Sequence, residues 1–236
     1  MPAGVSIGDE IGYAVALSKD GTTVALGGIG QFQSDMGSGT ALYFFSQNPA
    51  NATQWLQDGP TISLYVRELA ISDDDNTVLA VVQGEYVPAT FHRENGSWTR
   101  DLFPPFAPGS FEISLSADGQ TALVANITLL IPDPCMVALF SRISEGEWVF
   151  ESTILVQPTS GACPSIALSG DSNTIVIQSV GGVVPHALTY SLSPGGTWVP
   201  NTDLVSSGAV AVDPSTYLNI RCALSYDGTT AVLKNE

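Results

Sequence analysis

The chain has 236 residues and a formal net charge of −16, with 23 acidic residues against seven lysines and arginines. This balance disfavours nucleic acid and anionic membrane surfaces as partners, because clustered lysine and arginine side chains recognise both. No apolar stretch approaches the roughly 20 residues that a membrane-spanning helix needs, so we expect no membrane insertion.

A short motif recurs five times along the chain, about every 50 residues. Its consensus is a small residue, leucine or isoleucine, serine, any residue, aspartate, two further residues, threonine and an apolar residue. The anchoring serines are Ser18, Ser72, Ser116, Ser169 and Ser225. A tryptophan follows in each of the first four repeats, at Trp55, Trp98, Trp148 and Trp198. Two markers that recur in one order indicate a repeat architecture.

Each repeat contains short apolar runs separated by turn residues, and no segment has the periodicity of a helix. The first repeat has such runs at 13–17, 23–26 and 41–45, and a fourth run starts at Trp55. Four antiparallel strands per repeat are typical of a propeller blade. We therefore predict an all-β fold, a β-propeller of four-stranded antiparallel blades, with four complete blades and part of a fifth in this chain.

The repeats are predicted to form a single β-propeller domain, or a fragment of one, over residues 1–236. Their approximate bounds are 9–60, 61–107, 108–157, 158–207 and 208–236. The fifth repeat stops after its second strand, which leaves a sheet edge open to pairing. Two explanations follow. Either the chain is a piece of a longer propeller, or another subunit completes the edge in a homo-oligomer or a surface fibre.

The serine–aspartate turn between the first two strands of each repeat has a local physical basis. Serine and aspartate side chains can hydrogen-bond nearby backbone N–H groups, and glycine takes the positive φ that such a turn requires. Three copies have that glycine, at Gly21, Gly119 and Gly228. We therefore interpret these polar residues as structural rather than as ligands.

Three segments of the first repeat carry a family resemblance. They read IGYAVALS at 11–18, VALGG at 24–28 and GTALYFF at 39–45. Together with Trp55 they resemble FG-GAP repeats, which build integrin-α-like β-propellers. This similarity implies an extracellular adhesion module. Members with a calcium loop place it between the first two strands, where the hairpin of this chain is too short to hold one.

Three Asn-x-Ser/Thr sequons are candidate glycosylation sites, at Asn51, Asn95 and Asn126. Asn51 and Asn95 precede the tryptophans of successive repeats, where a glycan would face solvent. Together with the scarcity of lysine and the family resemblance, they favour an extracellular or cell-surface glycoprotein. Cys135 and Cys163 each precede a predicted strand near prolines, and we regard them as a candidate disulfide.

The chain contains only two histidines, no Gly-x-Ser-x-Gly elbow and no phosphate-binding loop. We therefore expect no cofactor and no metal site, and we interpret the acidic run at 73–75 as a charged turn. The strongest polar constellation is the position four residues before each anchoring serine, where innermost strands of a propeller converge. In chain order this position holds Ala14, Glu68, Glu112, Ser165 and Arg221. The candidate ligand-binding residues among them are Glu68, Glu112 and Arg221. The alternative role is an ion pair at a solvated mouth.

These observations favour a non-enzymatic, extracellular structural or adhesion module whose loops contact other protein chains or glycans. The alternative is a carbohydrate-active enzyme, a glycosidase or a lyase, that uses Glu68 and Glu112 as paired carboxylates. A third hypothesis is an integrin-like head stabilised by calcium.

Overall fold

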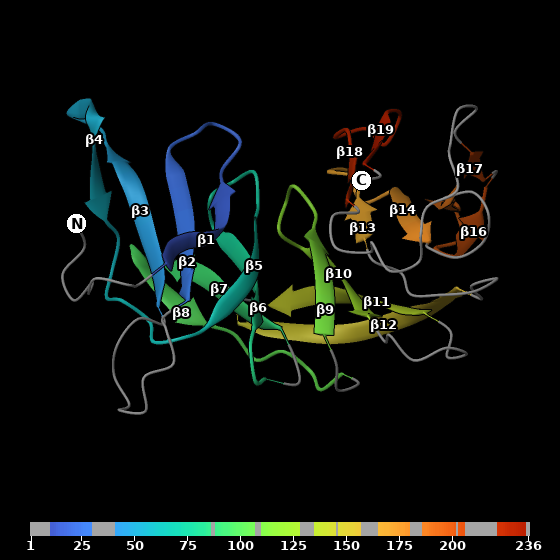
Figure 1. The fold of residues 1–236 in the computed structure, drawn as a ribbon, viewed down its shortest axis with the longest axis horizontal. Helices are drawn as coiled ribbons and strands as arrows, with labels where there is room; N and C mark the ends of the chain where they lie inside the picture. The colour runs from blue at the N-terminus through green and yellow to red at the C-terminus, as the bar shows by residue number, and fades with distance from the viewer. Residues whose placement is uncertain are drawn as a thin grey trace. The chain divides into compact units, whose positions relative to one another are not determined.

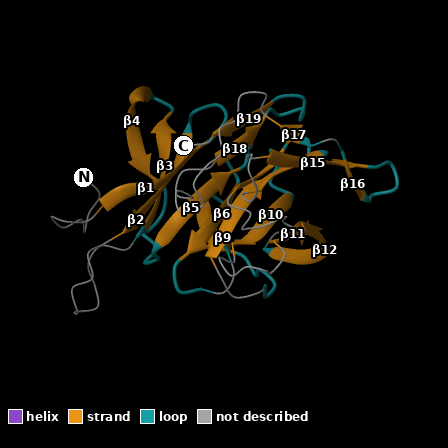
Figure 2. Ribbon diagram, turned by 45° about the vertical axis from the view of Figure 1, so that its right-hand side comes forward, coloured by secondary structure: helices purple, strands orange, loops and turns teal. Residues whose placement is uncertain are grey.

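The computed structural model describes residues 10–29, 41–85, 88–106, 110–127, 135–144, 146–156, 165–179, 186–201, 203–205 and 221–234. These residues form strands, turns and bends, and none of them is helical (Figure 2). The prediction of an all-β fold is confirmed. Within the same residues no helix is long and apolar enough to cross a membrane.

The strands pair in chain order into separate antiparallel sheets (Figure 1). The first sheet consists of β1 (Glu10–Leu17), β2 (Thr23–Ile29), β3 (Leu42–Asn48) and β4 (Asn51–Gln57). The second consists of β5 (Val66–Ile71), β6 (Thr77–Val82), β7 (Ala89–Glu94) and β8 (Ser97–Arg100). The third consists of β9 (Ser110–Leu115), β10 (Thr121–Ile127), β11 (Cys135–Ser144) and β12 (Glu147–Val156).

The fourth sheet is formed by β13 (Ser165–Leu168), β14 (Thr174–Ser179), β15 (His186–Leu192) and β16 (Trp198–Pro200), and β17 (Leu204–Val205) also pairs with β15. The fifth contains β18 (Arg221–Leu224) and β19 (Ala231–Lys234). Four-stranded antiparallel sheets in chain order are propeller blades, as predicted. Each sheet lies within one predicted repeat.

The chain divides into two compact units, one of Met1–Phe106 with Arg142–Trp148 and one of Ala107–Ser141 with Val149–Glu236. The first unit has a core shared by the first two sheets. The second unit has a core shared by the third and fourth sheets. The prediction of a single domain stays a prediction.

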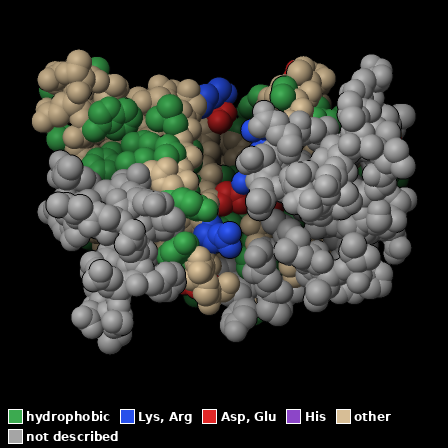
Figure 3. Space-filling model, viewed as in Figure 1, with side chains coloured by type: hydrophobic (Ala, Val, Ile, Leu, Met, Phe, Trp, Pro, Cys, Tyr) green, Lys and Arg blue, Asp and Glu red, His purple; other side chains and the backbone are tan. Residues whose placement is uncertain are grey.

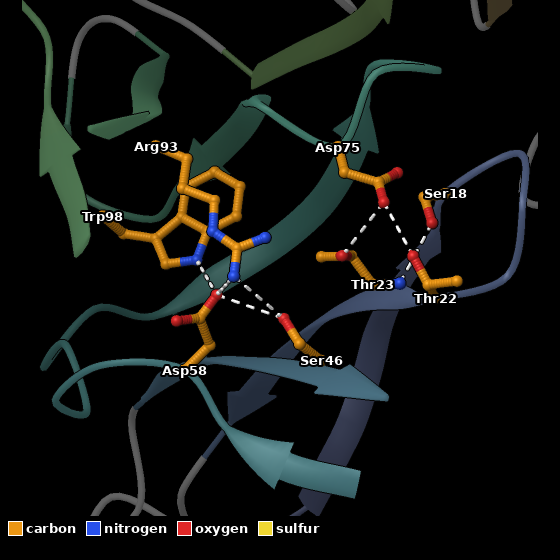
Figure 4. Close-up of polar contacts among 8 residues, drawn as sticks. All are labelled: Ser18, Thr22, Thr23, Ser46, Asp58, Asp75, Arg93 and Trp98. Carbon is orange, nitrogen blue, oxygen red and sulfur yellow. Dashed lines mark hydrogen bonds and ion pairs between the residues drawn. The ribbon is translucent and has the colours of Figure 1, made fainter. Parts of the chain in front are cut away.

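All five serine–aspartate turns have the same hydrogen bonds. In the first turn, Ser18 Oγ donates to Asp20 at 2.9 Å. The same hydroxyl accepts the backbone N–H of Thr23 at 3.0 Å (Figure 4). The equivalent bonds form at Ser72, Ser116, Ser169 and Ser225. The residue after the aspartate has positive φ whether or not it is glycine, since Asp75 has φ 63° and Ser172 has φ 60°. These bonds fix where each first strand ends and each second strand begins.

The recurring tryptophan connects one sheet to the next. Asp58, just after β4, accepts the indole N–H of Trp98 at 3.1 Å and pairs with Arg93 at 2.7 Å (Figure 4). Asp101, just after β8, accepts the indole N–H of Trp148 at 3.1 Å in the same way. In the first two sheets, an aspartate just after the fourth strand therefore holds the fourth strand of the following sheet.

The turn serine offers a direct test of the fold. Ser116 is fully buried, and its hydroxyl accepts the N–H of Thr121 at 2.9 Å. Ser116→Ala should lower the free energy of unfolding by about 1–2 kcal/mol, because it leaves that N–H buried without a partner. Denaturant titration measures this loss. Ser225→Ala is the matched control, since the same bonds there lie in an exposed turn, and it should cost less. Equal losses at both positions would contradict the assignment.

Candidate functional site

The position four residues before each anchoring serine lies on the first strand of each sheet. In the second compact unit, β13 contacts both β9 and β18. These three strands carry Glu112, Ser165 and Arg221 at that position. The common register of the turns therefore brings three polar side chains from three sheets to one level.

The carboxylate of Glu112 forms an ion pair with the guanidinium of Arg221, although 109 residues separate them in sequence. The Glu112 side chain is 8% exposed, whereas the Arg221 side chain is 62% exposed. A buried carboxylate is costly unless an opposite charge neutralises it, and Arg221 supplies that charge. The pair thus holds the Glu112 side chain in place while the guanidinium still faces solvent.

A second contact fixes the start of β18. Ser165 is buried, and its hydroxyl accepts the backbone N–H of Cys222 at 2.9 Å. The Cys222 Sγ lies 3.5 Å from the same oxygen and 3.9 Å from the carbonyl oxygen of Val176. Burial raises the pKa of Cys222 to about 11, so its thiol is neutral at pH 7 and a poor nucleophile.

A second cation lies opposite Arg221. Arg221 and Lys234 are directly opposite one another in the β18–β19 pair, and both are exposed. Side chains at directly opposite positions project from the same face of a sheet, where like charges repel. Two of the seven basic residues of an acidic chain therefore lie together.

Glu112 and Arg221 are thus the two predicted ligand-binding residues that the structure brings together. Glu68 lies half-buried on β5 in the other compact unit. Its predicted pairing with Glu112 stays a prediction.

The candidate glycosylation sites differ in exposure. Asn51 and Asn95 are exposed, whereas Asn126 is only 5% exposed on β10, so a glycan there would require its displacement. The glycosylation of all three stays a prediction. The candidate disulfide lies outside the described residues, since Cys163 and the side chain of Cys135 are not described.

The acidic run at 73–75 contacts different partners in the structure. Asp73 pairs with Lys19 at 2.8 Å, Asp74 belongs to its own serine–aspartate turn, and Asp75 accepts the Thr22 hydroxyl at 2.8 Å. Among the described residues, no group of three or more histidine, cysteine or acidic side chains is arranged to hold a metal ion.

His92 lies on β7 in the second sheet. It is buried, its Nδ1 contacts Asp101, and its Nε2 lies 3.7 Å from Glu94. Asp101 is the same residue that binds Trp148, so His92 belongs to the connection between sheets.

The sequence matches no family model and none of the curated proteins. Its fold is similar to a functionally unknown protein from Desulfotomaculum acetoxidans, with a TM-score of 0.60 and 16% identity over 93% of this chain and 64% of that chain. The periplasmic gluconolactonase of Pseudomonas aeruginosa has a TM-score of 0.59 and 14% identity, over 94% and 62% of the two chains. A candidate 6-phosphogluconolactonase from Bacteroides uniformis has a TM-score of 0.55 and 14% identity, over 94% and 77%.

These likenesses show the fold, a β-propeller of the kind found in the gluconolactonase. The chain spans less than two thirds of the length of the first two proteins. The expected membership of the integrin-like FG-GAP repeats is wrong, because the similar structures include a gluconolactonase and a candidate 6-phosphogluconolactonase and no family model matches. The prediction of a non-enzymatic adhesion or structural protein is wrong too, since these neighbours favour the enzymatic alternative.

One glycine that carried the resemblance has a packing explanation. A Cβ atom on Gly27 would lie 2.9 Å from the Cβ of Val66 in the next sheet. The close approach of two blades requires glycine at this position, whatever the family.

The raised pKa of Cys222 predicts its reactivity and a pH dependence of stability. At pH 8 the folded chain should be alkylated at Cys222 far more slowly than the unfolded chain, because the thiolate is the reactive form. The folded state keeps the thiol proton up to about pH 11, whereas an ordinary thiol loses it near 9.0. The stability that this group contributes is therefore present below pH 9.0 and is lost as the pH rises toward 11.

Peptide-resolved mass spectrometry of iodoacetamide-treated protein measures the labelling. Cys222→Ala is the control for the pH dependence of unfolding, because it removes the titrating group. Equal labelling rates for the folded and unfolded chains at Cys222 would contradict its burial.

Proposed function

We propose that this chain is part of a propeller hydrolase that opens a sugar-derived lactone at the site of Glu112 and Arg221. The observation that carries the proposal is the buried Glu112 carboxylate held against an exposed guanidinium on the first strands of two sheets. The names of the neighbouring gluconolactonase and candidate 6-phosphogluconolactonase support the substrate class. Because the chain spans part of those proteins, the activity is proposed for the whole protein.

Lactone hydrolysis needs a base, an anion-stabilising group and an acid. Water attacks the carbonyl carbon, and the carbonyl oxygen becomes an oxyanion in the tetrahedral intermediate. The ring C–O bond then breaks, and the ring oxygen takes up a proton to give a hydroxy acid. In the proposed mechanism, Glu112 removes the proton from the attacking water and returns it to the ring oxygen.

Arg221 and Lys234 supply the anion-stabilising charge. Both cations are exposed at directly opposite positions of β18 and β19, and Arg221 also contacts the Glu112 carboxylate. Fixed positive groups stabilise charge that develops in the transition state more than the neutral ester. A covalent route through Cys222 is not proposed, because its pKa of about 11 leaves it neutral.

The location outside the cell is likewise a proposal. Asn51 and Asn95 are exposed in equivalent positions before a tryptophan, where the folded chain would accept a glycan without rearrangement. A loss of mass at both peptides on enzymatic deglycosylation, after expression in a eukaryotic host, is the expected result. Unmodified peptides at both sites would remove this support.

The catalytic proposal is tested with Glu112→Gln. The variant keeps the size of the side chain and removes the base, so kcat/KM should fall by about 10²–10³-fold on the best substrate. Proton release measured in a pH-stat, with γ- and δ-aldonolactones and their 6-phosphates as substrates, reports the rate above spontaneous hydrolysis. Arg221→Gln should reduce kcat to a similar extent.

Glu85→Gln is the matched control. Glu85 forms an ion pair with Arg100 in the first compact unit, so its loss removes a pair of the same chemistry outside the proposed site. Its activity should equal that of the unchanged protein. Thermal unfolding of each variant separates loss of catalysis from loss of fold. A Glu112→Gln variant that is folded and fully active would overturn the proposal.

A further inference from the structure

The fourth sheet contributes two buried polar residues to the level of Glu112 and Arg221. Ser165 on β13 is directly opposite Gln178 on β14, just as Arg221 is directly opposite Lys234 on the next pair of strands. Charged side chains of both signs are visible at the surface in the space-filling view (Figure 3). Ser165 and Gln178 are polar as well, but they are only 2% and 1% exposed. They lie inside the second compact unit, on the sheet whose first strand contacts both β9 and β18.

The packing of a blade does not require a polar residue opposite the first strand at this level. A buried amide is costly unless its polar atoms are hydrogen-bonded. In the first three sheets the equivalent residues are apolar or glycine, and they are buried too. These residues are Gly27, Val81 and Ala125. The amide of Gln178 therefore has a role that is specific to the fourth sheet.

Ser165 and Gln178 each bond to the backbone of a strand that carries a cation. The Ser165 hydroxyl accepts the N–H of Cys222, the residue after Arg221, at 2.9 Å. The Gln178 Nε2 donates to the carbonyl oxygen of Lys234 at 3.4 Å. The second bond is long, so we expect the first to contribute more. One bond ties β18 and the other ties β19 to the fourth sheet, each at or next to a basic residue.

We propose that Ser165 and Gln178 are positioning residues, which hold Arg221 and Lys234 in place against the Glu112 carboxylate. They act through β18 and β19 rather than on the substrate, and their effect on catalysis rests on the proposed function. Charges that are fixed before the reaction stabilise a developing oxyanion without a cost of reorganisation. Loss of either bond lets a strand that carries a cation shift, and a small misplacement of a catalytic group slows a reaction.

Two measurements test the positioning role without any need for activity. Ser165→Ala removes the acceptor of the Cys222 N–H, so hydrogen exchange of that amide should become about tenfold faster or more. In the same background, the coupling between Glu112 and Arg221 in a double-mutant cycle of unfolding should fall by about half or more. Faster exchange at Cys222 with an unchanged coupling would overturn the proposal.

Steady-state kinetics on the lactones test the effect on catalysis. Ser165→Ala should lower kcat about tenfold and leave KM nearly unchanged, because the cations act on the oxyanion rather than on the neutral lactone. Gln178→Met keeps the length of the side chain and removes the donor, so it should lower kcat by a smaller factor. Ser165→Thr keeps the hydroxyl and should restore the rate. Full kcat in both Ser165→Ala and Gln178→Met would overturn the proposal.

Ser114→Ala is the matched control. The Ser114 hydroxyl accepts the N–H of Leu168 at 3.0 Å, which is the same kind of bond between neighbouring first strands, but at the far end of β13. Its loss should lower the melting temperature much as Ser165→Ala does, and it should leave kcat and the coupling of Glu112 with Arg221 unchanged. Equal losses of kcat in the two alanine variants would indicate a general structural effect and would contradict the positioning role.

Failure of the proposed function has a different signature. An unchanged protein that opens none of the lactones would overturn the proposed function alone. Hydrogen exchange at Cys222 and the coupling of Glu112 with Arg221 would still decide whether Ser165 positions the cation.

Discussion

The hydroxyl of the anchoring serine is the group on which the rest of the structure depends. In each turn it donates to the aspartate two residues later and accepts the N–H of the threonine that opens the second strand. Both bonds use short side chains, so the length of the turn is fixed at the same value in every sheet. Residues that lie the same number of positions before the serine therefore lie at the same level, that is, the same height along the first strand of every sheet.

This shared level explains how an ion pair forms between residues 109 positions apart. Glu112 and Arg221 reach one another because β9 and β18 both contact β13 and all three strands have the same register. The Ser165 hydroxyl reinforces that register with its bond to the Cys222 N–H. The site is a consequence of the repeat rather than an addition to it, although each repeat places a different side chain there.

The sequence predicted the strands well where the chain repeats itself. Serine, aspartate and threonine recur at fixed spacing, as at Ser116, Asp118 and Thr121. Their hydrogen bonds are sufficient to place a turn and its two strands. Tryptophan was recognised as a marker, but its partner was not. Asp58 and Asp101 lie at the ends of short strands, so only the folded sheets show that each binds the next tryptophan.

The function was harder to predict from the sequence than the strands were, for a physical reason. The glycines of the first repeat suggested a family, yet Gly27 is required by its close approach to Val66, which any pair of packed blades can demand. Asn126 is part of a sequon in the sequence, but in the structure it is buried on a strand. Glu112 and Arg221 were identified from register alone, but their ion pair, the half-buried Cys222 and the adjacent Lys234 needed coordinates.

The contact between Glu112 and Arg221 is the most direct measure of both the fold and the site. A double-mutant cycle with Glu112→Gln and Arg221→Gln measures their coupling in the free energy of unfolding. Residues in contact show interaction energies of about 0.5 kcal/mol or more, even where one partner is partly exposed. We expect a coupling of about that size. Strictly additive losses would contradict the account, because they would mean that the first strands of the third and fifth sheets do not share a level.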